Sequence, residues 1–333
     1  MATNKRQVFF DSLDNKNETV LASIWHHFLN SDEQVYGYKN DAVIKKNIIA
    51  QQQFYHKNRP DFTKIMSDAF LLHPSVLNTE INSVQDFKKI KSIGGDNEWI
   101  IKQVEAIKAI VSSYHGEIAS IYNIFAPAYY FRLKFDMVDN DRNKFPRLVE
   151  EDPYLFSLAL GRIADDITLL VEKLINEAHI DGIYLCVQSV QSPTFSEENY
   201  HKYIEPSQLR VLNSANQLSD YNVLHICGFE GRVNDLRHFA HYPVKAVNWA
   251  TCVENISLEE GKRIFPGKAL LGGFDNRTHG ALYQGLLGEI EKQTKEIIAK
   301  NGKAGLLLGA DCSVPKETDF KNIQFAARIA NSI

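Results

Sequence analysis

The stretch from residue 182 to residue 228 decides the fold. It begins with G-I-Y-L-C-V-Q (182–188), continues with a helical pattern over 197–218, and ends with N-V-L-H-I-C-G (222–228). Each apolar, β-rich run has the length of a strand that is buried on both faces. A strand, a helix and a second strand in this order predict a right-handed βαβ unit, in which the two strands are parallel.

The same alternation recurs along the whole chain. Eight short apolar runs are present, at 20–28, 62–70, 118–127, 182–188, 222–228, 245–250, 268–274 and 303–310. Helical patterns lie between and after them, at 40–57, 97–114, 152–178, 197–218, 230–241, 256–264, 284–300 and 317–332. This pattern predicts an α/β fold, a (β/α)8 TIM barrel, as a single domain over 1–333 with N-terminal additions. A doubly wound open sheet is the alternative, although no G-x-G-x-x-G follows the first run.

The composition is that of an ordinary globular enzyme. Of 333 residues, 44% are hydrophobic and 23% are charged, so the chain can bury a large core and is not disordered. The net charge is −4 and no basic stripe is visible, which argues against a nucleic-acid partner. The four cysteines are too few for a disulfide scaffold, and residues 1–7 lack the apolar core of a signal peptide. Because no apolar run is long enough to span a membrane, we expect a cytoplasmic protein with reduced thiols.

Functional residue types gather where the predicted strands end. In a parallel barrel, chemistry takes place at the C-terminal ends of the strands. The residues at those ends are His26, His27, Asp68, Asn123, Gln188, His225, Cys227, Asn248, Trp249, Asp275, Asp311 and Cys312. So many polar groups at one rim exceed what folding requires and indicate a site. For Asp68 and Asp275 the alternative is a helix N-cap, which is the commoner use of such aspartates. For the two adjacent histidines, the alternative is a rim pair with one ring buried.

His225 and Cys227 are two residues apart, so they share one face of the predicted strand. In a barrel that face is the interior, and Cys312, after the eighth run, lies across the same mouth. One imidazole and two thiolates select zinc over magnesium or calcium, and three protein ligands leave a fourth position open, as in catalytic zinc sites. The alternative is packing, because free cysteines often behave as small buried hydrophobes. Cys186 and Cys252 are interpreted in this second way.

Several of these segments together match a known superfamily. They are S-I-W-H-H-F (23–28), D-F-T-K-I-M-S-D (61–68), H-I-C-G (225–228), V-N-W-A (247–250), L-L-G-G-F-D-N (270–276) and L-G-A-D-C-S-V-P-K-E-T (308–318). With them, the chain resembles the uroporphyrinogen decarboxylase superfamily over most of its length. The resemblance implies a (β/α)8 barrel and one of two chemistries. One is cofactor-free decarboxylation of a porphyrinogen; the other, in the branch similar to methylcobamide:coenzyme M methyltransferases, is zinc-dependent methylation of a thiol.

The chain departs from the decarboxylases at their most specific motif. Those enzymes grip the porphyrinogen carboxylates with R-Q-A-G-R-Y, whereas this chain has W-H-H-F-L-N (25–30) and no arginine from Gln7 to Asn58. Arginine is the side chain suited to a carboxylate clamp. Asp68 does match the decarboxylase aspartate. The zinc ligands of the methyltransferase branch are matched at all three positions, by His225, Cys227 and Cys312.

The resemblance therefore favours a zinc-dependent methyltransferase. It implies Zn²⁺ on the three matched ligands, a small thiol or methylated substrate, a corrinoid supplied by a partner protein, and a homodimer. The candidates for catalysis or substrate contact are Asp68, Gln188, Asp275 and His27. Uroporphyrinogen decarboxylase, an enzyme of haem biosynthesis, is the alternative function. A second alternative is a non-catalytic barrel that binds a small ligand or a corrinoid protein.

Overall fold

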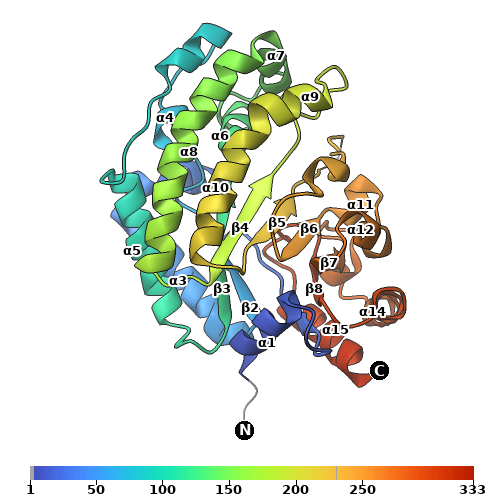
Figure 1. Ribbon diagram of the computed structural model, residues 1–333. Coiled ribbons are helices and arrows are strands. Elements are labelled where there is room, and N and C mark those ends of the chain that lie inside the picture. Colours follow the sequence, from blue (N-terminus) through green and yellow to red (C-terminus); the bar gives the residue numbers. More distant parts are fainter. Residues whose placement is uncertain (1–3, 230) are drawn as a thin grey trace.

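Eight parallel strands form one sheet that is nearly closed into a barrel (Figure 1). The computed structural model describes residues 4–229 and 231–333. The strands follow the spatial order β1-β8-β7-β6-β5-β4-β3-β2. They are β1 (Leu21–Ala22), β2 (Phe62–Ile65), β3 (Ala119–Phe125), β4 (Gly182–Val187), β5 (Val223–Ile226), β6 (Ala246–Trp249), β7 (Ala269–Phe274) and β8 (Leu306–Ala310). Each predicted run contains one of them, so the predicted barrel is confirmed.

Helices surround the sheet and connect its strands (Figure 1). The α-helices are α1 (Lys5–Leu13), α2 (Ser31–Tyr36), α3 (Asp41–Asn58), α4 (Pro74–Leu77), α5 (Glu98–Ser112), α6 (Pro127–Leu133), α7 (Lys144–Glu151), α8 (Pro153–Asn176), α9 (Glu197–Asn199), α10 (Glu205–Leu218), α11 (Thr251–Glu254), α12 (Leu258–Ile264), α13 (Ala281–Gln284), α14 (Leu287–Asn301) and α15 (Phe320–Ser332). The 3₁₀ turns are η1 (Gly37–Lys39), η2 (Val84–Lys89) and η5 (Leu236–Phe239), and the π turns are η3 (Lys134–Val138) and η4 (Tyr200–Ile204). The side chains of Asn40, Asn97 and Asp152 cap the first turns of α3, α5 and α8, which is why these helices begin there.

The helix predicted over 230–241 is wrong. Residue 230 lies outside the described residues, and the rest of the range contains only the short turn η5. Gly231 has a φ of 80°, which a helix does not accept. The Asn234 amide oxygen accepts from the Ser189 N–H (2.8 Å), and its Nδ2 donates to Glu254 (2.7 Å). These bonds to distant segments hold the chain in a loop, and they outweigh a weak helical periodicity.

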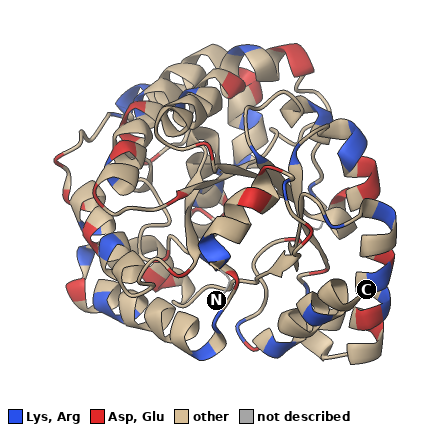
Figure 2. Cartoon of the chain, turned by 60° about the horizontal axis from the view of Figure 1, so that its bottom comes forward, with Lys and Arg blue, Asp and Glu red and all other residues tan. Residues whose placement is uncertain are grey.

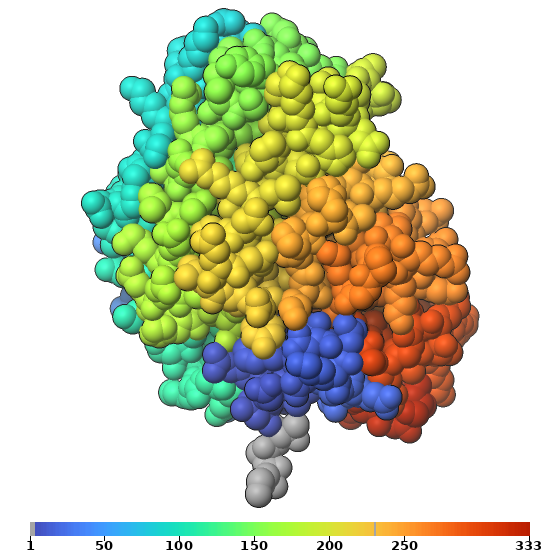
Figure 3. All heavy atoms as spheres, in the orientation of Figure 1, coloured from blue at the N-terminus to red at the C-terminus, as the bar shows by residue number. Residues whose placement is uncertain are grey.

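The N-terminal helix α1 lies across the bottom of the barrel, between the middle and the C-terminal parts of the chain (Figures 1 and 3). The Phe9 ring of α1 packs against Phe62 at the start of β2, with the ring centroids 5.1 Å apart. Arg6 pairs with Asp181, just before β4, at 2.6 Å. This helix is therefore an N-terminal addition that covers the end of the barrel opposite the expected site.

The bottom face of the chain is mixed in charge (Figure 2). Figure 2 shows Lys and Arg interspersed with Asp and Glu over the bottom face, without a stripe of one sign on that face. None of the described helices is both long and apolar enough to cross a bilayer. The expectation that residues 1–7 form no signal peptide falls partly on residues 1–3, which lie outside the described residues.

β1 and β2 are the edges of the sheet, and no backbone ladder joins them in the described chain. Two aspartates bridge this seam instead. Asp61, just before β2, accepts a hydrogen bond from the Ala22 N–H of β1 (3.0 Å). Asp68, beyond the end of β2, accepts from the N–H groups of Phe28 (2.6 Å) and Leu29 (3.1 Å). At both ends of the seam, side-chain carboxylates therefore provide the hydrogen bonds that a backbone ladder would otherwise provide.

We expect Asp61→Ala to lower the free energy of unfolding by about 1–3 kcal/mol, because the buried Ala22 N–H loses its acceptor. Chemical denaturation followed by circular dichroism measures this change. Asp96→Ala, at an exposed aspartate ahead of α5, is the matched control. Equal stability of the two variants would contradict the bridging role.

Candidate metal centre

His225, Cys227 and Cys312 meet at the C-terminal mouth of the barrel. His225 lies in β5, Cys227 directly follows that strand, and Cys312 lies just beyond β8. One ligand atom from each residue lies within 4.8 Å of the others. His225 is 1% exposed and Cys227 is 9% exposed, while Cys312 is partly buried. The structure thus brings together the three side chains that the sequence suggests as ligands.

Asn248 determines which nitrogen of His225 is free. Its Nδ2 donates to the carbonyls of Leu271 (2.7 Å) and Ala310 (3.3 Å), so its Oδ1 faces the other way. That oxygen lies 2.5 Å from His225 Nδ1 and 2.5 Å from the Tyr184 hydroxyl, and an amide oxygen can only accept. The His225 proton is therefore on Nδ1. Its Nε2, buried without a hydrogen-bond partner among the described residues, presents a lone pair, as a metal-binding histidine does.

The two thiols of the group are linked to each other. A hydrogen bond from Cys227 holds the pKa of Cys312 well below its usual value. The same bond, together with burial, raises the pKa of Cys227 well above the usual range of a thiol. Within the pair, Cys312 is therefore the sulfur that ionises more easily. Because a metal binds thiolates, metal binding at this group would release a proton.

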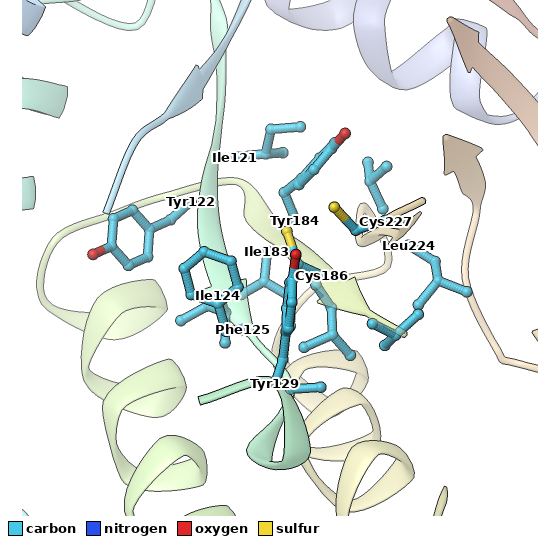
Figure 4. Packing of buried hydrophobic residues seen from close by; sticks show 14 of the residues in the cluster. Ile121, Tyr122, Ile124, Phe125, Tyr129, Ile183, Tyr184, Cys186, Leu224 and Cys227 are labelled. Carbon is cyan, nitrogen blue, oxygen red and sulfur yellow. The ribbon is translucent and has the colours of Figure 1, made fainter. Parts of the chain in front are cut away.

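A cavity of ≈160 Å³ opens onto the three side chains. Its apolar wall comes from Met66, Leu71, Phe125, Leu133 and Met137. Its other lining residues are His27, Gln34, Lys64, Asn123, Tyr129, Cys186 and Ser313. Figure 4 shows Tyr129, Tyr184, Cys186 and Cys227 gathered beside the ends of β3, β4 and β5. The cavity has the size for a small molecule, and most of its wall offers that molecule no hydrogen bond.

Lys64 places a buried positive charge in the cavity wall. The residue lies in β2 and is 6% exposed. Its Nζ lies 4.2 Å from the ring centroid of Tyr184 and 5.1 Å from that of Trp25, which is cation–π geometry. Burial raises the pKa of Cys186 to about 12, and the Lys64 charge opposes that shift. The ammonium group therefore favours negative charge on the sulfurs that share this cavity.

A buried polar network supports Cys227 from behind. Gln188 Nε2 donates to the Cys227 carbonyl (2.7 Å), and Asn234 Nδ2 donates to the same oxygen (3.2 Å). Asn234 Nδ2 also donates to Glu254 Oε1 (2.7 Å). A Cβ on Gly228 would lie 2.1 Å from that carboxylate oxygen. The close approach of Glu254 therefore explains why glycine follows the cysteine in H-I-C-G.

His27, Asp68 and Gln188 take different positions relative to the cavity. His27 lines the cavity, its side chain is 38% exposed, and its Nδ1 lies 2.6 Å from Asp68 Oδ1. Asp68 is fully buried and is not among the lining residues, because its oxygens are engaged by His27 and the loop after β1. Gln188 lies behind Cys227, and its Oε1 is buried without a hydrogen-bond partner in the described chain. Catalytic roles for these three residues stay predictions.

Asp275 and Cys252 lie at the rim, outside the cavity lining. The Asp275 carboxylate pairs with Arg277 (2.8 Å) and lies 3.2 Å from His279 Nε2. Its role in catalysis also stays a prediction. Cys252 is exposed, so the interpretation of this residue as core packing is wrong. It lies in the first turn of α11, where its N–H donates to Asp311 (2.9 Å). Cys186, in contrast, is buried as predicted.

Sequence reasoning missed the roles of Lys64, Tyr129 and Asn248. A lysine within the apolar run F-T-K-I-M was a usable signal, because a charge in a buried strand is costly unless it serves a purpose. The asparagine in V-N-W-A was a second usable signal, because an amide side chain in a buried strand needs hydrogen-bond partners. Tyr129 lies in α6, in an aromatic segment without any distinguishing pattern.

Comparison with known proteins supports the resemblance. No protein-family model matches the chain. The chain is 23% identical over 252 residues to a methylcobamide:CoM methyltransferase of Methanosarcina mazei, covering 75% of this chain and 69% of the relative. Identity to the enzyme of the same name in Methanosarcina acetivorans is 21%, with the same coverage. The resemblance to this branch of the superfamily is thus confirmed as distant homology.

Solved structures agree on the fold. A B12-independent methionine synthase from Shewanella sp. W3-18-1, in complex with selenomethionine, has a TM-score of 0.58 at 11% identity, covering 94% of this chain and 97% of that chain. A β-mannanase from the blue mussel Mytilus edulis has a TM-score of 0.51 at 12% identity, covering 92% and 91%. At these identities the likeness shows the barrel fold alone.

We expect Asn248→Ala to weaken metal binding about 10–100-fold, because the outer partner of a ligating histidine typically contributes that much. Competition with a chromophoric chelator measures the dissociation constant. Asn216→Ala is the matched control, since that amide donates to the Pro243 carbonyl (2.7 Å) away from the mouth. If both variants bound metal as the unmodified protein does, the orientation of His225 would not depend on Asn248.

Proposed function

We propose that this protein is a zinc-dependent methyltransferase that moves a methyl group between a corrinoid or small methylated donor and a thiol. The observation that carries the proposal is the group of His225, Cys227 and Cys312, whose ligand atoms lie within 4.8 Å of one another. The distant homology to methylcobamide:CoM methyltransferases supports the same chemistry.

The three side chains fit zinc in number, type and charge. A neutral imidazole and two thiolates form a soft donor set, and the two negative charges balance a divalent ion. His225 already presents Nε2 in the required protonation state. Three protein ligands leave one position for substrate, and the ≈160 Å³ cavity lies beside it.

Zinc at this position would hold a thiol substrate as its thiolate, which is the nucleophile for methyl transfer. The residues of the chain then control the surroundings of that sulfur. Tyr129 lines the cavity with Cys227, and its hydroxyl works against the rise in the pKa of that sulfur. Lys64 offsets the negative charge that a bound thiolate adds to a neutral centre. The apolar wall around Met66, Phe125 and Leu133 keeps water away from the reacting sulfur.

The size of the cavity determines which of the two substrates can enter it. Pockets for drug-sized molecules are about 300–1,000 Å³, and this cavity of ≈160 Å³ is smaller. It suits a small thiol, whereas a corrinoid is too large to enter and would present its methyl group at the mouth. We propose that a partner protein carries that corrinoid, and that the donor and acceptor belong to the classes named for the relatives, a methylcobamide and CoM.

The two alternatives lack comparable support. The decarboxylase alternative depends on Asp68, whose carboxylate is bound by His27 and the N–H groups of Phe28 and Leu29 and does not line the cavity. The non-catalytic alternative gives no role to the open position that three ligands leave beside the cavity. Both alternatives remain as outcomes of the experiment that follows.

We expect protein purified without chelator to contain zinc at this centre and to transfer a methyl group from methylcobamide to a small thiol. Cys312→Ser should lose that zinc and at least about 100-fold of the transfer rate, because the centre keeps only two ligands. Mass spectrometry of the metal and product analysis measure the two effects. Cys252→Ser, at an exposed thiol outside the cavity, is the matched control.

Three results would contradict the proposed function. An unchanged zinc content in Cys312→Ser would contradict a metal centre formed by His225, Cys227 and Cys312. Turnover of uroporphyrinogen without metal, abolished in Asp68→Ala, would support the decarboxylase instead. Binding of a corrinoid protein without methyl transfer to any thiol would support the non-catalytic barrel.

A separate test addresses the positive charge in the cavity. We expect Lys64→Met to raise the KM for the thiol about tenfold or more while zinc content stays unchanged, because one charge interaction of about 1.5–3 kcal/mol is lost. Steady-state kinetics with the thiol as varied substrate measures this. Lys91→Met, at an exposed lysine, controls for the loss of charge alone. An unchanged KM would show that Lys64 only packs against Tyr184.

A further inference from the structure

A second group of metal-binding side chains lies outside the barrel mouth. His201 is in η4 and Glu205 begins α10, so the two residues are one helical turn apart on one face. His241 comes from the connection between η5 and β6. One ligand atom from each lies within 4.8 Å of the others, and none of the three residues lines the cavity at His225. In Figure 3 the two segments, yellow and orange, adjoin on the face shown.

Glu205 is the centre of this group. It is only 8% exposed, with Oε2 3.0 Å from His201 Nδ1 and Oε1 2.7 Å from His241 Nε2. The second contact lacks the geometry of a hydrogen bond, and Oε1 has no hydrogen-bond partner among the described residues. A buried carboxylate oxygen is costly to leave unpaired. The two atoms form an ion pair when His241 is protonated, and a bound divalent cation can take the place of that proton between them.

The spacing is close to that of a metal site. Zinc–nitrogen and zinc–oxygen bonds of about 2.0–2.2 Å put neighbouring ligand atoms of a tetrahedral site about 3.3–3.6 Å apart. The two contacts of Glu205 are shorter because, without a metal, the first is a hydrogen bond to His201 (3.0 Å) and the second an ion pair with His241 (2.7 Å). The side chains of His201 and His241 are 35% and 52% exposed, so they have room to rotate to the required distance.

The surrounding charges also suit a divalent cation. Glu197 Oε1 lies 3.5 Å from His201 Nε2 and 3.9 Å from His238 Nε2, so a second carboxylate adjoins the group. Two carboxylates and neutral imidazoles together balance two positive charges. The His238 ring stacks on Tyr200 with centroids 5.2 Å apart, and its Nδ1 is buried without a hydrogen-bond partner in the described chain. Either Glu197 or His238 can complete the coordination.

We propose that His201, Glu205 and His241 form a second site for a divalent transition metal of the zinc class. Two imidazoles and one carboxylate are a nitrogen–oxygen donor set, chemically distinct from the sulfur-rich centre at His225. The bound ion would tie the loop after η5 to the start of α10. The proposal does not depend on the proposed methyltransferase activity, because it concerns different residues and a different donor set.

Metal stoichiometry under equilibrium dialysis against zinc tests this site. We expect two zinc ions per chain in the unmodified protein, and one in His241→Ala and in Glu205→Gln. Cys312→Ser should also hold one, and Cys312→Ser combined with His241→Ala should hold none. In the Cys312→Ser protein loaded with cobalt(II), the remaining site should lack sulfur-to-cobalt charge-transfer absorption, because it contains no thiolate.

His56→Ala, which removes an exposed histidine of α3, is the matched control and should keep both ions. Thermal denaturation of each variant without metal checks that it folds. The second site would be overturned if His241→Ala and Glu205→Gln bound as much zinc as His56→Ala. It would also be overturned if Cys312→Ser bound none. Unchanged zinc in Cys312→Ser would instead count against the centre at His225 and leave this site supported by the loss in His241→Ala.

Discussion

The Asn248 amide is the interaction on which the rest of the centre depends. From β6 it hydrogen-bonds the Tyr184 hydroxyl of β4, the His225 ring of β5, and the carbonyls of Leu271 in β7 and Ala310 in β8. One buried side chain therefore connects five strands inside the barrel. Each of these groups would cost about 1–3 kcal/mol if left unpaired, so the amide has a single favourable orientation. The proton on His225 Nδ1 is therefore set by the packing of these five strands and does not require a bound ligand.

The interior of the barrel also holds charged side chains in an apolar environment. Cys227 and Cys312 adjoin Lys64, the one cation among the residues that line the cavity, apart from histidine. The aromatic rings of Tyr184 and Trp25 solvate the ammonium group in place of water. The Lys64 ammonium group thus lies near the sulfurs that can form thiolates. The apolar wall strengthens the attraction between these opposite charges, because it lowers the local polarity.

The fold was predictable from the sequence because its signal is repeated. Eight apolar runs with helical patterns between them leave little choice beyond a parallel barrel, and the positions of the proposed ligands follow from the strand ends. The segment 230–241 was not predictable, because the bonds of Asn234 to Ser189 and Glu254 are made to residues distant in sequence. Tyr129 is a similar case: it faces Cys227 only because α6 is folded over the mouth. Patterns reveal periodic burial, but not which distant side chains meet.

The seam beside β1 has a consequence for how the protein is made. β1 pairs only with β8 among the described strands, through Leu21 with Leu307 and Ala22 with Leu308, whereas every other ladder joins strands consecutive in the chain. During synthesis β1 is the first of these strands to leave the ribosome, but its partner β8 is made only after β2 to β7. β2 to β7 can assemble step by step as an open sheet with two unpaired edges, which are prone to associate with other chains. Cys312 emerges just after β8, so closure of the barrel and completion of the proposed metal ligands both wait until β8 has been made.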